Sequence, residues 1–334
     1  MSTQSLNQGG VVQRLARARA VMSQNGIYAL LVPSADPHLS EYLPEYWQGR
    51  QWLSGFHGSV GTLIITPTFA GVWADSRYWE QATKELAGST IELVKLVPGQ
   101  PGPLEWLAEQ TPKGETVSVD GAVFALAFAR TLESRLKERG AFLRTDIDLL
   151  NLVWEGRPSL PAKPLYEHLA PQATVGRVEK LAQLRETLTQ RKANAHFIAT
   201  LDDIAWLFNL RGADVPFNPV FVSFALIEER QATLFVDLTK VSPELRDSLL
   251  KEGVTLRDYN EIASALLALP ESTRLLVDPA RVTCGLLGNL KAGVKLVEGL
   301  NPTTLAKTKK SLDDVFYIRQ AMEQDGAALC EFFA

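Results

Sequence analysis

The chain has 334 residues and a mass of 36.8 kDa, which exceeds what one hydrophobic core usually organises, so we expect two domains. Hydrophobic residues at 46%, charged residues at 22%, a net charge of −4 and the lack of a long apolar run argue against a membrane protein and a nucleic-acid partner. The two cysteines, Cys284 and Cys330, lie far apart and indicate neither a disulfide framework nor a thiolate zinc site.

The N-terminal half of the chain alternates predicted helices and strands. Its polar start, MSTQSLNQGG, lacks the apolar core of a secretory signal, so we expect a cytoplasmic protein. Apolar spacing and turn residues then predict helix 11–26, strand 27–32, a short helix around QWLSGFHG, strands 60–66 and 70–74, helix 77–86, strand 90–96, helix 102–110, strand 116–120 and helix 124–140. This order is typical of an α/β domain.

Three prolines mark a linker in the middle of the chain. Pro158, Pro161 and Pro164 in WEGRPSLPAKPLY each remove a backbone donor and disfavour helix at the preceding residue. Beyond the linker the same kinds of element recur in the same order: helix 176–193, strand 196–201, helix 202–210, strands 219–227 and 232–238, helix 244–253, strand 254–259, helix 261–269, strand 273–278 and a further segment 286–293. The sequence therefore predicts two copies of one α/β domain.

A short motif is repeated in the two copies. QWLSGFHGSVGT begins at Gln51, and AWLFNLRGADVP begins at Ala205. In each copy we expect the Trp-Leu pair to pack the short helix onto the sheet, and the glycine after His57 or Arg211 to give the backbone a conformation that a Cβ would oppose. This structural role does not explain why His57 is replaced by Arg211.

The last predicted element is a long amphipathic helix. Ser311 is a suitable N-cap, and Asp313 and Asp314 lie in the first turn, where the helix dipole favours anions. The apolar residues that follow keep helical spacing, namely Val315, Ile318, Met322 and Leu329. No stop signal precedes Ala334, so we expect the natural polypeptide to continue into a third domain.

Four long strings carry a family resemblance: LVPSADPHLSEYLPEYWQGRQWLSGFHGSVGTLIIT, WADSRYWEQA, WEGRPSLPAKP and LDDIAWLFNLRGADVPFNPVFVSFALI. They resemble the three-domain Xaa-Pro aminopeptidases, also called aminopeptidase P, and the likeness extends from about Gly26 to the end. The resemblance implies an α/β chain of two tandem creatinase-N-like domains, each a mixed β-sheet flanked by helices. The catalytic pita-bread domain would be absent apart from its first helix.

The resemblance also implies the domain boundaries and the function. Domain I would span 1–155, the proline-rich linker 156–166, domain II 167–310, and the start of the catalytic-domain helix 311–334. The whole enzyme would remove an N-terminal residue that precedes proline, using two divalent metal ions, manganese or similar, in the missing domain. This chain would bind no metal, would be inactive alone, and would shape access for short peptides with proline in second position and contribute to homo-oligomer contacts.

The residues themselves give no complete active site. The four histidines occur singly, and the sequence has no His-Glu-x-x-His spacing, no Gly-x-Ser-x-Gly elbow and no phosphate-binding glycine loop. None of the metal ligands of the resembled family has a matching position in 1–334. Two alternatives remain open: a non-enzymatic peptide- or protein-binding module with an aminopeptidase-like fold, and a purely structural dimerisation fragment.

The first candidate substrate-shaping residue lies in the string ADSRYW. Arg77 either forms a structural contact with Asp75, which we favour, or faces the catalytic domain of its own or a neighbouring subunit. His57 is predicted to be a hydrogen-bonded structural histidine rather than a catalytic base, because no acid or nucleophile lies beside it in the sequence.

The second group of candidates lies in the loop NLRGADVPFNPV. Arg211 could orient a peptide carbonyl or carboxylate, and Asp214 could attract a free α-amino group. The structural alternative pairs Arg211 with Asp214 and lets Asn218 cap a turn before Pro219. On the first interpretation, arginine replaces histidine in the second copy because its loop faces the missing active site.

Overall fold

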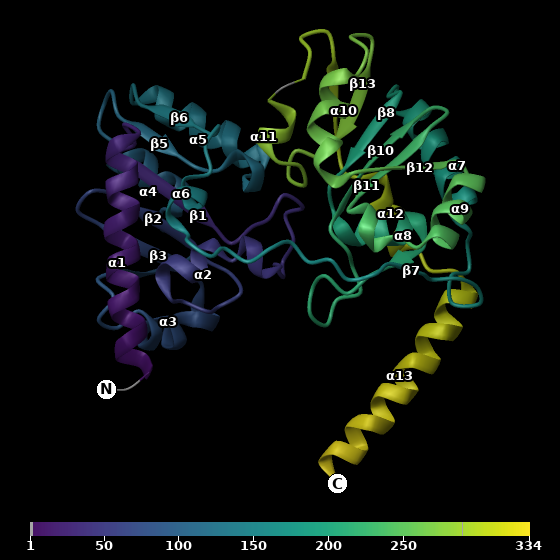
Figure 1. The fold of residues 1–334 in the computed structure, drawn as a ribbon, viewed down its shortest axis with the longest axis horizontal. Helices are drawn as coiled ribbons and strands as arrows, with labels where there is room; N and C mark the ends of the chain where they lie inside the picture. The colour runs from purple at the N-terminus through teal and green to yellow at the C-terminus, as the bar shows by residue number, and fades with distance from the viewer. Residues whose placement is uncertain (1–2, 289) are drawn as a thin grey trace. The chain divides into compact units, whose positions relative to one another are not determined.

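The computed structural model describes residues 3–288 and 290–334, and its contacts divide the chain into two units (Figure 1). Unit 1 comprises Met1–Pro161 and Pro279–Asn289, and unit 2 comprises Ala162–Asp278 and Leu290–Ala334. No helix among the described residues is both long enough and apolar enough to cross a membrane.

Unit 1 follows the predicted order of helices and strands and adds two elements. Its elements are α1 Thr3–Gln24, β1 Ala29–Pro33, α2 Gly49–Ser54, β2 Thr62–Ile65, β3 Ala70–Ala74, α3 Trp79–Glu85, β4 Glu92–Lys95, α4 Pro103–Gln110, β5 Thr116–Ser118, α5 Leu126–Glu138, β6 Phe142–Arg144, α6 Leu149–Val153 and α11 Cys284–Leu287. The two additions within the N-terminal half are β6 and α6, whereas α11 overlaps the segment 286–293 that the sequence analysis places in the second copy. Strand β6 escaped prediction because it is three residues long and none of them is fully buried.

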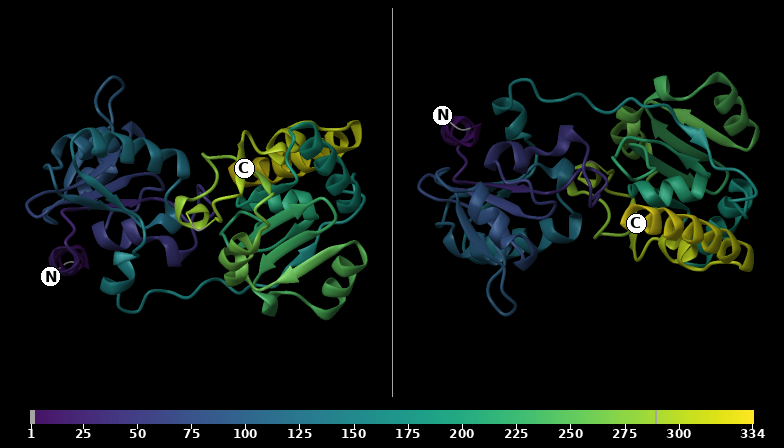
Figure 2. Two further views of the ribbon diagram at one scale, coloured as in Figure 1. Left: turned by 90° about the horizontal axis from the view of Figure 1, so that it is seen from above. Right: turned by 90° about the horizontal axis from the view of Figure 1, so that it is seen from below.

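The strands of unit 1 form one mixed sheet in the order β4-β3-β2-β1-β5-β6. Strands β1, β2 and β3 pair antiparallel as consecutive neighbours, whereas β4, β5 and β6 join their neighbours in parallel. Figure 2 shows α1 nearly end-on beside this sheet. One face of the sheet packs on α1, α2 and α6 and the other on α4 and α5, so β1 is buried on both faces.

The short segment Pro279–Asn289 joins unit 1 through its backbone, whereas the sequence analysis places 167–310 in one domain. The Leu126 N–H donates to the Val282 carbonyl and the Cys284 N–H donates to the Phe124 carbonyl, both at 2.9 Å. A Cβ on Gly285 would lie 2.7 Å from the carbonyl carbon of Gly121. Glycine at 285 therefore allows the two backbones to touch.

Unit 2 repeats the order of elements. They are β7 Tyr166–Glu167, α7 Arg177–Gln190, β8 Ala195–Ile198, α8 Leu201–Phe208, β9 Leu210–Arg211, β10 Ser223–Glu228, β11 Ala232–Val236, α9 Pro243–Lys251, β12 Val254–Arg257, α10 Ile262–Ala268, β13 Arg274–Val277, β14 Lys295–Glu298, α12 Pro302–Thr308 and α13 Leu312–Phe333. The sequence analysis did not predict β7, β9, β14 or α12. The first two are two-residue strands that pair only with each other.

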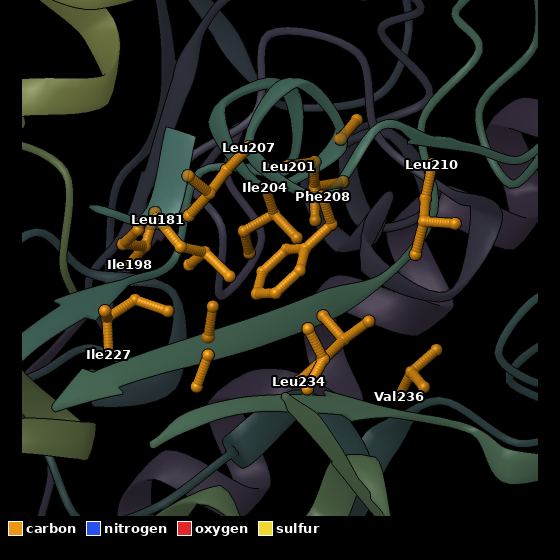
Figure 3. Packing of buried hydrophobic residues seen from close by; sticks show 14 of the residues in the cluster. Leu181, Ile198, Leu201, Ile204, Leu207, Phe208, Leu210, Ile227, Leu234 and Val236 are labelled. Carbon is orange, nitrogen blue, oxygen red and sulfur yellow. The ribbon is translucent and has the colours of Figure 1, made fainter. Parts of the chain in front are cut away.

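The sheet of unit 2 has the order β12-β11-β10-β8-β13-β14, which matches unit 1 strand for strand. Parallel and antiparallel pairings also correspond, with β8 in the place of β1. Leucines of α7 and apolar residues of α8 pack on one face of this sheet, as Figure 3 shows for Leu181, Ile204 and Phe208. The prediction of two copies of one α/β domain is confirmed.

Helix α13 ends the chain with the predicted cap. The Ser311 hydroxyl accepts from the Asp314 N–H at 3.0 Å, and the Asp314 carboxylate accepts from the Ser311 N–H at 2.8 Å. None of its residues is buried, and several large apolar side chains are exposed, among them Leu312, Phe316, Met322, Phe332 and Phe333.

Candidate functional site

The repeated motif forms the same corner in both units. Gly55 caps the C-terminus of helix α2 and Asn209 that of helix α8, and both are in the left-handed conformation, with φ of 74° and 49°. The side chains of Leu53 and Leu207 are fully buried beneath the corner. The corner therefore presents His57 in unit 1 and Arg211 in unit 2 at matching positions.

The glycines that follow these two residues are needed for close packing, which corrects the prediction of a backbone conformation that a Cβ would oppose. Neither Gly58 nor Gly212 has a positive φ. A Cβ on Gly58 would lie 2.8 Å from the ring of Tyr78, and one on Gly212 would lie 2.7 Å from the Cβ of Phe221. The close approach of aromatic side chains excludes any larger residue.

A cation from the first helix of each unit lies beneath the tryptophan of the motif. Arg14 of α1 donates to the Trp52 carbonyl, and its guanidinium lies 5.2 Å from the centre of that indole. Lys180 of α7 donates to the Trp206 carbonyl at 2.8 Å, and its ammonium lies 4.3 Å from the indole. Arg14 and Lys180 each lie fifteen residues before the first residue of β1 or β8, so they are positional equivalents.

A cleft of about 900 Å³ opens beside Trp206 in unit 2. Helices α7, α8 and α12 and the first turns of α13 form its walls, together with the chain around His168 and Thr174. The charged side chains that line the cleft are those of Lys180, Arg211, Lys307, Lys309, Lys310 and Asp314. Among the described residues the cleft is therefore lined by an excess of positive charge.

Arg211 lies in this cleft, half-buried. One of its guanidinium nitrogens donates to the carbonyls of Ala205 and Leu210 at 2.8 and 2.9 Å, so the side chain is oriented by main-chain acceptors. Burial lowers the pKa of Arg211 below its usual value. Burial, followed by repulsion from Arg211, lowers the pKa of Lys180 to about 8. The Lys180 ammonium also donates to the Asn209 side-chain oxygen at 2.6 Å.

Asp214 does not pair with Arg211, so the structural alternative from the sequence is wrong on this point. Its carboxylate is buried and receives the Lys240 ammonium at 2.6 Å and the Val222 N–H at 2.7 Å. The Lys240 and Asp214 side chains are 1% and 0% exposed. Because the Asp214 side chain is fully buried, a free α-amino group could reach it only if the surrounding chain moved.

Asn218 lies in a tight turn ahead of Pro219. Its N–H donates to the Val215 carbonyl at 3.2 Å, and its carbonyl accepts from the Val220 N–H at 2.8 Å. Phe217 at the tip of this turn has a φ of 61° and a fully exposed ring. The structure thus places Arg211 in the cleft, Asp214 in the interior and Asn218 in the turn, and brings no two of these side chains together.

Arg77 forms the contact with Asp75 that the sequence analysis favours. Two guanidinium nitrogens donate to the two Asp75 oxygens at 2.9 and 2.8 Å, and Asp75 also accepts from the Arg77 N–H at 3.1 Å. Hydrogen bonding to Arg77 lowers the pKa of Asp75. The Trp79 indole N–H donates to the Ala74 carbonyl at 2.9 Å. The ion pair with Asp75 holds Arg77 at the surface of unit 1, where the Arg77 side chain is 65% exposed.

His57 has an acidic neighbour that lies far away in the sequence. Its N–H donates to the Glu85 carboxylate at 2.8 Å, and its ring nitrogen Nδ1 lies 3.5 Å from the same carboxylate. The ring is half exposed. The prediction of a hydrogen-bonded histidine holds for the backbone, and its partner Glu85 comes from α3.

The described residues 3–288 and 290–334 contain no group of three or more His, Cys, Asp or Glu side chains that could hold a metal ion. The buried His196, for example, has a main-chain carbonyl as its hydrogen-bond partner. Its Nδ1 lies 2.9 Å from the Leu276 carbonyl, and burial lowers its pKa to about 4. These residues do not fit a two-metal centre.

Sequence reasoning missed Lys180, which is the most buried cation of the cleft. It occupies one apolar-stripe position of α7, beside Leu181, Leu184 and Leu188. A lysine within a buried helical stripe is the signal that could have found it, because such a charge needs a polar partner.

Comparisons with known proteins agree with the two units. Two family models, both described as Creatinase/Prolidase N-terminal domain, match residues 14–158 and 156–313. Two proteins named "Probable Xaa-Pro aminopeptidase P", from Aspergillus niger and Botryotinia fuckeliana, are 37% and 35% identical to this chain over 96% of its length.

The chain spans about half the length of these relatives, covering 54% of the first and 51% of the second. A solved structure from Caenorhabditis elegans shows the same partial coverage. It is described as an X-prolyl aminopeptidase, a cytosolic enzyme with a di-nuclear active site, and superposes with a TM-score of 0.91 at 26% identity. The match covers 97% of this chain and 55% of that one.

Proposed function

Both halves of this chain belong to the creatinase/prolidase N-terminal domain family, and on that premise we propose that the chain is the non-catalytic N-terminal part of a metal-dependent Xaa-Pro aminopeptidase. The observation that carries the proposal is the unequal coverage. Nearly the whole of this chain matches about half of each relative and of the worm enzyme. The remaining half of such a protein would carry the catalysis.

The metal centre of the proposed enzyme would lie outside the described residues. The worm enzyme is described as having a di-nuclear active site, which supports two divalent ions, and we propose manganese as their identity. Because the described residues offer no ligand cluster, we assign no step of the reaction to them. Their part is positional.

That part would be to limit access to short peptides with proline in second position and to make contacts between subunits of a homo-oligomer in the cytoplasm. The cytosolic worm enzyme supports this location. Arg77 and Arg211 are the best-placed substrate-shaping candidates. Each is oriented by hydrogen bonds, and neither guanidinium is fully buried. Asn218 would act through the turn that it closes, and Asp214 only through the buried pair with Lys240.

The first test is the activity of the chain alone. The purified 334-residue chain with Mn²⁺ should release no N-terminal residue from an Xaa-Pro peptide, whereas full-length aminopeptidase from Aspergillus niger assayed in parallel should. Release by the chain alone, at a rate above the peptide-only blank, would contradict the proposal.

A second test measures the native polypeptide. Its intact mass, determined in cells that make it, should lie well above 36.8 kDa, because a catalytic half of comparable length is expected. A native mass equal to that of this chain would contradict the proposal and favour the non-enzymatic binding module.

A further inference from the structure

The clefts beside Trp52 and Trp206 occupy equivalent positions in the two units but differ in volume. In unit 1 the site around Arg14, Trp52, Gly55 and His57 has a volume of about 240 Å³. The matching residues in unit 2, Lys180, Trp206, Asn209 and Arg211, line the cleft of about 900 Å³. The same corner of the fold is therefore narrow in one unit and open in the other.

The two sites differ in their walls, because α13 and the chain around Thr174 line only the cleft of unit 2, and in what covers each tryptophan. In unit 1 the Trp154 indole stacks on Trp52, with ring centres 4.9 Å apart and planes 11° apart. Glu155, the next residue, forms an ion pair with Arg17 on α1. The chain itself therefore covers the tryptophan of the first site with a second aromatic ring.

Unit 2 lacks this cover. Trp154 lies five residues after the start of α6, and the residue five positions after the start of α12 is Lys307. Lys307 turns to Asp203 at 2.9 Å and also contacts Asp202. Among the described residues, no aromatic ring stacks on Trp206 as Trp154 stacks on Trp52. The site keeps its tryptophan and its cation without an aromatic partner.

The charges of the open site favour an anion. The Lys180 ammonium, 93% buried as a residue, meets only neutral acceptors in its hydrogen bonds, the Trp206 carbonyl and the Asn209 side chain. Arg211 likewise donates to carbonyls. The carboxylate of the cleft, Asp314, hydrogen-bonds to Thr174 at 2.7 Å and to its own helix cap, and it attracts Lys180 through space without a hydrogen bond to it. Two close cations that hydrogen-bond to neutral groups provide a site for a carboxylate.

We propose that the cleft beside Trp206 binds an aromatic carboxylate, whose ring stacks on the Trp206 indole and whose carboxylate is held by Lys180 and Arg211. The ring of the ligand would take the place that the Trp154 indole holds on Trp52 in unit 1. The C-terminal aromatic residue of a peptide and a free aromatic acid share this chemistry. The proposal concerns unit 2 by itself and does not depend on the peptidase function.

The experiment is calorimetric titration of the 334-residue chain with four probes. N-acetylphenylalanine carries ring and carboxylate in peptide-like form, and phenylacetate carries both as a free acid. N-acetylphenylalaninamide lacks the charge and acetate lacks the ring. One or both aromatic acids should bind at least about tenfold tighter than the amide and acetate. The tighter of the two acids identifies the source as a peptide end or a free acid.

Variants locate the binding. Arg211→Gln should weaken the aromatic acid by at least about tenfold, whereas the same change at the exposed Arg246→Gln, on α9, should leave the affinity unchanged. Trp206→Leu should weaken it through loss of stacking. If that variant unfolds, the shift of the Trp206 indole N–H resonance on titration of the unmodified chain replaces it. Binding of the amide as tight as that of the acid, equal affinity in Arg211→Gln and the unmodified chain, or no binding of either acid up to about 10 mM would overturn the proposal.

Discussion

In unit 1 the corner after the short helix is held by Arg50, whose guanidinium donates to the Phe56 carbonyl at 2.7 Å and also to that of Gly58. In unit 2 the corresponding corner is held by the ion pair of Lys240 with Asp214. Both cations are buried. The cation that holds this corner therefore meets neutral acceptors in unit 1 and a carboxylate in unit 2, although the sheets have the same strand order.

The comparison shows that two units with the same topology can hold the same corner with a buried cation while using different hydrogen-bond acceptors for it. Carbonyl acceptors keep hydrogen-bonding ability without charge when the cation is removed. A carboxylate left alone in the interior retains a full charge. The two units should therefore respond differently to loss of the cation and to changes of pH.

The largest difference is expected when the cation itself is removed. Lys240→Met leaves Asp214 charged and buried, so the free energy of unfolding should fall by about 3–5 kcal/mol in urea denaturation. Arg50→Met leaves neutral acceptors, the Phe56 and Gly58 carbonyls and the Ser34 hydroxyl, and no carboxylate in hydrogen-bond contact, so it should cost less. The double variant Lys240→Met/Asp214→Leu should recover most of the loss. A loss in Lys240→Met no larger than that in Arg50→Met would break the comparison.

The next difference concerns acid. His196 on β8 occupies the sheet position that Leu30 holds on β1, and burial lowers its pKa from 6.5 to about 4. Between these values the unfolded chain takes up a proton that the folded chain does not, so stability falls as the pH drops below about 6.5. At pH 5 this contribution amounts to about 2 kcal/mol.

Replacing His196 with the residue of unit 1 tests this contribution. His196→Leu should flatten the loss of stability between pH 6.5 and pH 4, measured as the urea midpoint at a series of pH values. The equivalent change in unit 1, Leu30→Val, serves as the control and should leave the slope of stability against pH unaltered. An unchanged slope in His196→Leu would show that other groups cause the acid sensitivity.

A further difference is expected in unit 1. Burial, followed by repulsion from Asp148, raises the pKa of Asp120 to about 6. At the matching place in unit 2 the partner of Asp278 is Asn301, whose N–H lies 3.4 Å from the Asp278 carboxylate. Asp120→Asn, which can still accept from the Ala122 N–H, should therefore raise stability at pH 7 by up to about 3 kcal/mol.

The sign of this effect follows from the raised pKa. Between pH 4 and pH 6 the folded chain holds a proton on Asp120 that the unfolded chain has lost, so stability falls as the pH rises through this window. In thermal melts at a series of pH values, the stability of Asp120→Asn should not fall between pH 4 and pH 6 as that of the unmodified chain does. A variant less stable than the unmodified chain at pH 7 would indicate that the carboxylate serves a role that asparagine cannot fill.

The duplicated fold was predictable because its signal is local. Apolar runs, turn residues and the twice-written Trp-Leu motif all lie within short windows, and β1 and β8 are buried on both faces. The edge strands β6 and β14 escaped prediction because their residues are half-buried or exposed. Their position is decided by neighbours distant in the sequence.

The site was predictable only in part. Arg211 was identified because it breaks the symmetry of a repeated motif. The partner of Asp214 is Lys240, twenty-six residues away on another element, and no local pattern connects them. The stacking of Trp154 on Trp52 joins residues about a hundred positions apart. Pairings of this kind depend on which distant elements the fold brings together, and this is visible only in the folded structure.

The segment Pro279–Asn289 bears on how the chain can be dissected. A single proteolytic cut in the proline-rich linker separates the polypeptide into two pieces, yet part of unit 1 would then belong to the C-terminal piece. The N-terminal fragment would lose the Val282 carbonyl that receives the Leu126 N–H and the contact of Gly285 with Gly121. Each unit consequently has its own core, but unit 1 is built from two separate stretches of the sequence. The two pieces of a chain cut in the linker should therefore co-purify.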